Sequence, residues 1–225
     1  SVVVAEGVHF ENASWGSRPK MLEVGRLEVH IRLRSLLNGP VVVELIDLED
    51  TVVEVVKSES GVSNWAVVEA KESAQGETST TLLRIKEISV DNVHVSWSSP
   101  HHSEPLDIDI ESLTQNERPD EMLDYTLSAR FGEHQLSLGG TVGTWPAILA
   151  GKDIVFDLEG TMDAYEITSD GRIDDLARPA RPQLSFAAAG PDIDISGSLT
   201  PGADGPLVLD VRGYAGSAQV DANGS

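Results

Sequence analysis

The densest group of side chains that could hold a metal ion lies in the segment HHSEPLDIDIE, residues 101–111. Its potential ligands are His101, His102, Glu104, Asp107, Asp109 and Glu111. Imidazole nitrogens together with carboxylate oxygens suit zinc and other divalent cations. Two adjacent histidines point to opposite sides of an extended chain, however, and acidic residues that alternate with Ile108 and Ile110 are also typical of the solvated face of a strand. We therefore predict no metal site.

Other catalytic chemistry finds little support in the sequence. Cysteine is absent, and no serine lies in the G-x-S-x-G context that exposes a nucleophile on a sharp turn. The segment LGGTVG is poor in glycine for a phosphate-binding loop and lacks its lysine. Asp174 and Asp175, adjacent in GRIDDLARP, are more typical of a turn or a helix cap than of a catalytic carboxylate pair. We predict a protein that is not an enzyme and uses no cofactor.

The charge balance excludes one large class of partners. The chain has 37 Asp and Glu but only 16 Lys and Arg, so its formal net charge is -21, and such a surface repels DNA, RNA and anionic membranes on average. No run approaches the roughly 18 apolar residues of a membrane-spanning helix, and SVVVAEG lacks the regions of a signal peptide. We expect any membrane anchor to lie outside this sequence, in a longer parent chain.

Alternating apolar and polar residues predict strands along most of the chain. From Leu27 to Leu33 an apolar residue occupies every second position, which is the period of a half-buried strand. In the first half we expect strands near residues 2–10, 26–33, 41–47, 51–57, 81–97 and 105–111. The second half divides into four consecutive hairpins, in residues 122–142, 154–173, 183–199 and 206–220. Two short helices, at 34–39 and 144–151, each end in glycine as a C-cap would.

Glycines recur in phase with the apolar positions of the hairpins. They are Gly140, Gly160, Gly171, Gly197, Gly213 and Gly216, and the first, third and fourth occupy equivalent places in the repeated return arms LSLGGTV, ITSDGRI and IDISGSL. A glycine inside a strand costs roughly 0.5 to 1 kcal/mol relative to alanine, so its repeated use calls for a reason. Either the sheet bends sharply there, or something approaches the backbone closely and a ligand has room.

The apolar face of these hairpins consists mostly of Val, Ile, Leu and Ala, and aromatic residues make up only 5% of the chain. A smooth aliphatic face suits packing against another sheet or against acyl chains better than stacking on sugars or bases. Composition and periodicity leave both alternatives open.

Several segments resemble the periplasmic region of the AsmA family, which includes TamB-like proteins. In that family an alternating strand leads into a short SLL.G helix, a further strand and a DG..NW corner. Ser35, Leu36, Leu37 and Gly39 fit the helix, and Gly61, Asn64 and Trp65 fit the corner, where Ser60 replaces the usual aspartate. The segment LSLGGTVGTWPAILAGKDIVFDLEGTMDAYEITSDGRIDDLARP, ending at Pro179, is similar to the following part of the family. The resemblance covers most of the chain and is weakest in 66–80 and after about residue 200.

This resemblance implies a protein of Gram-negative bacteria that is anchored in the inner membrane and whose periplasmic part is a long, curled β-sheet with an apolar groove. Relatives are thought to conduct phospholipids between the two membranes. Each acyl methylene exposed to water costs about 0.8 kcal/mol, so a lipid that crosses an aqueous gap needs an apolar sheath.

We therefore predict a mainly β fold: a curled antiparallel β-meander that forms an open apolar groove, with one or two short helices. We expect a single domain over 1–225, with sub-units 1–120 and 121–225, the latter built of repeated hairpins. The residues that we expect to line the lipid groove are Leu123, Leu127, Leu136, Leu138, Ile154, Phe156, Leu158, Ile167, Ile193 and Ile195. The glycines expected at its bends are Gly140, Gly160, Gly171 and Gly197.

The predicted partner of this face is phospholipid, with envelope proteins as further partners. The alternative from another class is a closed β-sandwich that acts as an interaction or scaffold domain in outer-membrane assembly. A hydrolase acting on envelope lipids ranks third. The two leading hypotheses differ on whether the apolar residues are open to a ligand or buried against a second sheet.

Overall fold

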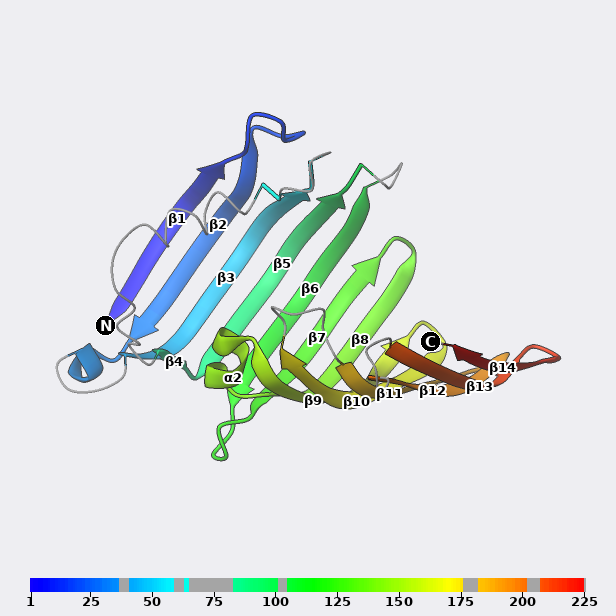
Figure 1. Cartoon of the computed structure of the whole chain (residues 1–225). Coiled ribbons are helices and arrows are strands. Elements are labelled where there is room, and N and C mark those ends of the chain that lie inside the picture. The colour runs from blue at the N-terminus through cyan, green and yellow to red at the C-terminus, as the bar shows by residue number, and fades with distance from the viewer. Residues whose placement is uncertain are drawn as a thin grey trace. The chain divides into compact units, whose positions relative to one another are not determined.

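The computed structural model describes residues 1–36, 41–58, 63–64, 83–100, 105–175, 182–201 and 207–224. These residues form fourteen strands and two short helical segments, so the protein is mainly β. The strand order does not close, because β1 (Val2–Glu11) and β14 (Ala218–Gly224) each pair with a single strand. The predicted fold class, a curled and unclosed sheet with one or two short helices, is confirmed (Figure 1).

The chain divides into two compact units. Unit 1 comprises residues 1–114 and 129–133, and unit 2 comprises residues 115–128 and 134–225. The expected sub-units were 1–120 and 121–225. The structure differs in two segments, because residues 115–120 belong to unit 2 and residues 129–133 belong to unit 1.

Unit 1 is a mixed sheet. It contains β1, β2 (Lys20–Ile31), the 3-10 helix η1 (Leu33–Leu36), β3 (Val41–Val56), β4 (Leu83–Ile85), β5 (Glu87–Ser98) and most of β6 (Leu106–Glu117). Its strands are hydrogen-bonded in the order β1-β2-β3-β5-β6, and β4 also pairs with β3. The η1 turn falls where the first helix is expected, and residues 37–39 of that helix lie outside the described residues.

Two details of unit 1 differ from the prediction. The strands expected at 41–47 and 51–57 are one continuous strand, β3. In addition, β3 pairs in parallel with β4 and β5, in a register from Ile46 opposite Ile88 to Val56 opposite Ser98. Two parallel strands need a connection that returns the chain from one end of the sheet to the other. The alternation of residues within each strand gives no information about such a connection.

A row of residues that crosses four neighbouring strands interrupts the alternation in unit 1. The register places Gly7 of β1, Gly25 of β2, Asp50 of β3 and Asn92 of β5 opposite one another in turn. Gly7, Asp50 and Asn92 have φ of 63°, 51° and 55°, the left-handed region that Gly, Asn and Asp tolerate best. The Asn92 side-chain amide donates to the Asp50 carboxylate at 2.6 Å. We call these four residues the transverse row.

The transverse row shifts the apolar pattern in the strands that it crosses. Apolar residues lie two apart on either side of the row but three apart across it, as from Ala5 to Val8 and from Val90 to Val93. As at a β-bulge, the additional residue resets the alternation. A strict period of two therefore predicts a break between 47 and 51, where β3 in fact continues.

A buried polar corner holds the loop between β1 and β2 against β3. Glu54, only 3% exposed, accepts hydrogen bonds from the Asn12 side-chain amide and the Ser17 hydroxyl. Asn64, 1% exposed, donates to the Glu54 carbonyl oxygen at 2.8 Å and accepts from the Val56 N–H at 2.9 Å. Asn64 belongs to the predicted corner motif, whose other members lie outside the described residues.

Replacing the corner asparagine tests this role. Asn64→Ala leaves the Val56 N–H and the Glu54 carbonyl oxygen without their side-chain partner, so we expect the free energy of unfolding to fall by about 2 kcal/mol. The exposed Asn223→Ala should change it by less than about 0.5 kcal/mol. Urea unfolding followed by circular dichroism measures both, and equal effects would contradict the role assigned to Asn64.

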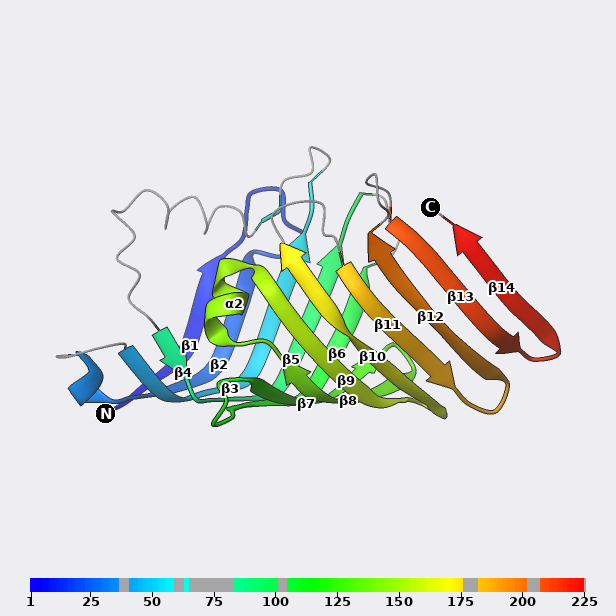
Figure 2. The ribbon, with the colours of Figure 1, turned by 60° about the horizontal axis from the view of Figure 1, so that its bottom comes forward.

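Unit 2 is an antiparallel meander (Figure 2). It contains the start of β7 (Leu123–Phe131), followed by β8 (His134–Val142), α2 (Trp145–Ala150), β9 (Lys152–Met162), β10 (Tyr165–Asp175), β11 (Pro182–Ala189), β12 (Ile193–Pro201), β13 (Leu207–Ala215) and β14. Each strand from β8 to β14 pairs antiparallel with the next. The four predicted hairpins are confirmed, although β9, β10, β11, β12 and β14 extend one to four residues beyond the expected bounds.

The second predicted helix is confirmed as α2. The Thr144 side chain caps its start by accepting from the Ala147 N–H at 3.4 Å. Gly151 ends it in the left-handed conformation with φ of 62°, as a glycine C-cap does.

The glycines of unit 2 lie where the backbones of neighbouring strands approach each other closely. Gly140, Gly160, Gly171 and Gly197 fall on the same face as the apolar residues that pair with them. A Cβ atom at Gly140 would overlap the carbonyl oxygen of Asp157, and one at Gly160 would overlap that of Ser137. The neighbouring strand itself occupies the space beside these glycines, which favours the interpretation that they allow the sheet to bend.

The prediction that Gly216 is in phase with the apolar positions of a strand is wrong. Gly216 lies in the turn between β13 and β14 with φ of 59°, and a Cβ atom there would meet no other atom within 4 Å. Its left-handed conformation serves the hairpin turn, and it is not in phase with the strand glycines.

Two adjacent glycines of β8 allow a matched test of close approach. Gly140→Ala would place Cβ against the β9 backbone at φ of 141°, so we expect it to lower the free energy of unfolding by about 2 kcal/mol or more. Gly139→Ala meets its nearest neighbour, the Tyr125 carbonyl oxygen, at an ordinary 3.8 Å. Urea unfolding of both variants should separate them, and equal losses would refute the steric explanation.

Candidate functional site

The registers of unit 2 place the apolar side chains of seven consecutive strands on one face. One aligned row runs through Leu138, Gly160, Ile167, Ala188 and Ile195. We define the apolar face by the larger residues of this and the adjacent rows: Leu136, Leu138, Phe156, Leu158, Ile167, Leu184, Phe186, Ile193, Ile195, Leu199, Val211 and Val220. Paired residues in antiparallel strands point to the same side, so these side chains form one continuous surface.

Aromatic rings lie beside two of the strand glycines. Phe156 pairs with Gly171, and Phe186 pairs with Gly197. The ring of Phe186 lies so close to Gly197 that a Cβ atom there would meet its Cζ at 2.5 Å. An aromatic side chain next to a strand glycine covers backbone that would otherwise be open to water.

The apolar face is half-buried over most of its extent. Strands β9 and β10 alternate between partly buried apolar positions and exposed polar ones. Within the described part of unit 2 the strands belong to one sheet, and no second sheet packs on this face. The closed sandwich of the alternative hypothesis needs two packed sheets, which these residues do not form.

The ten residues predicted to line the groove fall into two groups. Leu127, Leu136, Leu138, Phe156, Leu158, Ile167, Ile193 and Ile195 are partly exposed. Leu123 is fully buried and Ile154 is 7% exposed, so both are core positions that a ligand does not reach. The prediction that Leu123 and Ile154 line an open groove is therefore wrong.

Helix α2 closes the apolar face only beside Ile154, since Leu207 and Leu209 at the same end of β13 are 38% and 40% exposed. A Cβ atom at Gly143, the residue before the N-cap, would contact side-chain carbons of both Ile154 at 3.5 Å and Ile148 at 3.6 Å. The N–H of the buried Leu123 donates to the Gly143 carbonyl oxygen at 3.1 Å. Met162, at the other end of β9, is 40% exposed. We call the end of the sheet beside Ile154 the α2 end. We call the opposite end, beside Met162, the turn end, because the tight turns of the hairpins lie there.

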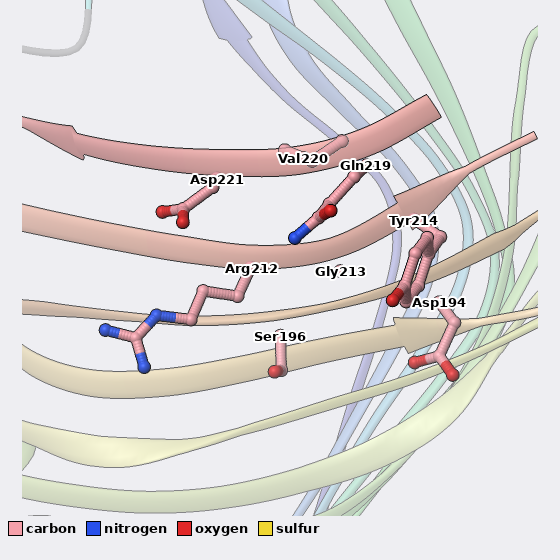
Figure 3. A pocket seen from close by; sticks show the side chains of 8 residues that line it. All are labelled: Asp194, Ser196, Arg212, Gly213, Tyr214, Gln219, Val220 and Asp221. Carbon is pink, nitrogen blue, oxygen red and sulfur yellow. The ribbon is translucent and has the colours of Figure 1, made fainter. Parts of the chain in front are cut away.

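Three hollows of unit 2 lie mainly over its polar face. Their volumes are about 310, 470 and 500 Å³. Figure 3 shows the first, with polar side chains from β12, β13 and β14: Asp194, Ser196, Arg212, Tyr214, Gln219 and Asp221. These hollows give no support to a groove on the apolar face, and that prediction depends on the open apolar face alone.

Carboxylates and their partners link neighbouring turns at the turn end. Asp163 contacts the His134 ring at 2.6 Å and accepts from the Gln135 N–H at 2.9 Å. These hydrogen bonds, chiefly the one with His134, lower the pKa of the Asp163 carboxyl. The Tyr165 hydroxyl donates to Asp192 at 2.7 Å, which raises the pKa of that phenol.

The acidic segment of the first half does not form a metal centre within the residues described. Asp109 contacts His94 at 2.8 Å and Arg130 at 3.5 Å, and these contacts, led by the hydrogen bond with His94, lower the pKa of its carboxyl. In the described part of the chain no group of three or more His, Asp or Glu could hold a metal ion. His101, His102 and Glu104 lie outside that part.

Sequence reasoning missed the transverse row and the turn-end contacts. Both carry a signal: Gly7, Asp50, Asn92 and Asp163 are the residue types that adopt positive φ most readily, and the first three sit where apolar residues are three apart. The contact between Tyr165 and Asp192 has no such signal, since it joins two different hairpins.

The chain matches none of the protein-family models, and no curated protein is significantly similar to it. The resemblance to the AsmA family therefore stays a prediction. Neither helical segment in the described residues is long and apolar enough to cross a membrane.

The contact of Asp163 gives a prediction about acid stability. Because the folded-state pKa of this carboxyl lies below its usual value near 3.9, the contact stabilises the fold above that pH, and the stabilisation is lost as the pH falls through the folded-state pKa. Asp163→Asn should therefore make the free energy of unfolding less dependent on pH below about pH 5. Urea unfolding at several pH values measures this, and His134→Ala should reproduce most of the change. Parent-like pH dependence in both variants would contradict it.

Proposed function

We propose that unit 2 holds the acyl chains of phospholipids against its apolar face, as a non-catalytic segment for lipid binding and transfer. The observation that carries the proposal is the register that gathers aliphatic side chains of seven strands on one face, with no second sheet over them in the described residues. Each methylene that such a face removes from water contributes about 0.8 kcal/mol. A chain of many methylenes is thereby stabilised without a specific polar contact.

The opposite face supports the same proposal. It carries exposed carboxylates and hydroxyls, such as Asp157, Glu159, Thr168 and Asp170. A sheet with one wet face and one aliphatic face can keep lipid tails dry while it stays in water. Following the resemblance, we propose that this takes place in the periplasm of a Gram-negative bacterium, on a chain tethered to the inner membrane that passes lipid towards the outer membrane.

Two substitutions on adjacent positions of one row test the proposal. Leu138 and Ile167 both pair with Gly160, and both are partly exposed, so Leu138→Asp with Ile167→Asp places two charges on the apolar face with limited damage to the fold. We expect the parent to carry phospholipid in native mass spectrometry after purification from a bacterial envelope, and the double variant to carry none while its circular dichroism is unchanged.

The polar face provides the matched control. Ser137→Asp with Thr168→Asp adds the same two charges to neighbouring positions of β8 and β10 on the opposite face. This control should retain its lipid. A parent without lipid, or a control that loses lipid together with the test variant, would refute the proposal, and the first result would favour the scaffold hypothesis.

A further inference from the structure

One end of unit 1 carries large apolar side chains that its sheet does not cover. Phe10, near the end of β1, is 49% exposed, and Trp15, in the loop between β1 and β2, is 41% exposed (Figure 1). The register runs from Phe10 across β2 and β3 to Val95, two residues before Trp97 of β5. Three of the four aromatic residues in the described part of unit 1 therefore lie at this end, the fourth being Phe131. We call it the loop end of unit 1.

The buried polar corner holds this loop in place. Glu54 accepts hydrogen bonds from both sides of the loop, from the Asn12 amide before Trp15 and from the Ser17 hydroxyl after it. The Asn12 side-chain amide also donates to the Arg18 carbonyl oxygen at 3.0 Å. A buried carboxylate costs free energy unless it is hydrogen-bonded, so these contacts favour a single conformation of the loop. Trp15 therefore lies on a preformed loop that loses little conformational entropy when a partner covers it.

The charges of the loop end differ from those of the whole chain. Between Glu11 and Glu23 the chain contains two cations and no carboxylate side chain, although its formal net charge is -21. The cations are Arg18 and Lys20, and Lys57, directly after β3 at the same end, adds a third. Lys20 contacts Glu23 at 2.5 Å, whereas Arg18 and Lys57 are exposed. Phosphate groups, which the chain as a whole repels, therefore meet positive side chains beside Trp15.

An exposed tryptophan beside cations fits the interface of a phospholipid membrane. The indole ring is apolar while its N–H can reach water or a head group, which is why tryptophan is enriched at that interface. Lys and Arg side chains extend to the lipid phosphates at the same depth. The opposite end of the unit exposes Leu33 at 56%, but no aromatic side chain lies there in the residues described. In the described part of unit 1, exposed aromatic side chains and cations thus occur together at the loop end.

We propose that the loop end of unit 1 docks on the surface of a phospholipid membrane. Trp15 and Phe10 enter the head-group region, and Arg18 and Lys57 lie against lipid phosphates. This contact goes beyond the acyl-chain binding proposed for unit 2, because it uses other residues and does not need the apolar face. It gives a chain that transfers lipid a fixed point of contact with a membrane that supplies or receives the lipid.

Flotation with vesicles tests the proposal. The whole 225-residue chain is mixed with vesicles of dioleoylphosphatidylcholine, whose neutral surface does not repel its net negative charge, and is separated on a density gradient. We expect the parent to float with the vesicles. Phe10→Ser with Trp15→Ser should lower the partition constant about tenfold, because two apolar side chains no longer leave water on binding. The circular dichroism of this loop-end variant should be unchanged, since both side chains are exposed.

Two apolar side chains elsewhere provide the matched control. Leu33→Ser with Leu149→Ser removes side chains that are 56% and 64% exposed, more than either loop-end residue. This control should keep the partition constant within about twofold of the parent. A parent that stays at the bottom of the gradient, or an equal fall in the control and the loop-end variant, would overturn the proposal.

A second pair of measurements separates membrane docking from lipid binding by unit 2. The Leu138→Asp with Ile167→Asp variant should float as the parent does, and the loop-end variant should still carry phospholipid in native mass spectrometry. Loss of flotation in the former alone would assign vesicle binding to the apolar face and overturn docking at the loop end. A parent that floats without bound lipid would contradict the proposed function and leave the docking intact. A parent that forms dimers instead of floating, through the same two side chains, would replace the membrane with a second copy of the chain.

Discussion

Neighbouring strands of unit 2 approach so closely at Gly140, Gly160 and Gly171 that a side chain at any of these positions would overlap the adjacent backbone. Single-layer bending depends on this approach, because a strand can turn sharply against its neighbour only where no Cβ intervenes. Phe156 and Phe186 lie opposite glycines and return apolar cover to the same places. The apolar face therefore stays continuous although its glycines carry no side chains.

Unit 1 solves a related problem with different residues. There the transverse row interrupts the alternation at the same register position of four strands, and Gly7, Asp50 and Asn92 in three of these strands are left-handed. Because the four strands are interrupted at the same position, their pairing continues on both sides of the row. Directly beyond it, Val24, Thr51 and Val93 are aligned and buried, so the interruption lies next to some of the best-packed positions of the unit.

The sequence was sufficient to predict the hairpins, the mainly β class and α2, because each depends on local periodicity or on caps such as Thr144 and Gly151. It was insufficient for the parallel pairing of β3 with β5, which is a contact between distant segments. For the candidate site, alternation identified most residues of the apolar face, but it could not show that α2 closes the face at Ile154. The burial of Leu123 likewise depends on tertiary contacts that no pattern within β7 records.

The parallel pairing in unit 1 also bears on the order in which the chain folds. Each hairpin of unit 2 closes over a turn of a few residues, whereas β3 and β5 meet only after some forty residues have been synthesised between paired positions such as Ile46 and Ile88. Contacts between distant residues carry a larger loop-closure entropy and form more slowly. The pairing of β3 with β5 is therefore expected to form more slowly than the hairpins of unit 2, although unit 1 is synthesised first. Until β5 is available, the edge of β3 stays unpaired on that side.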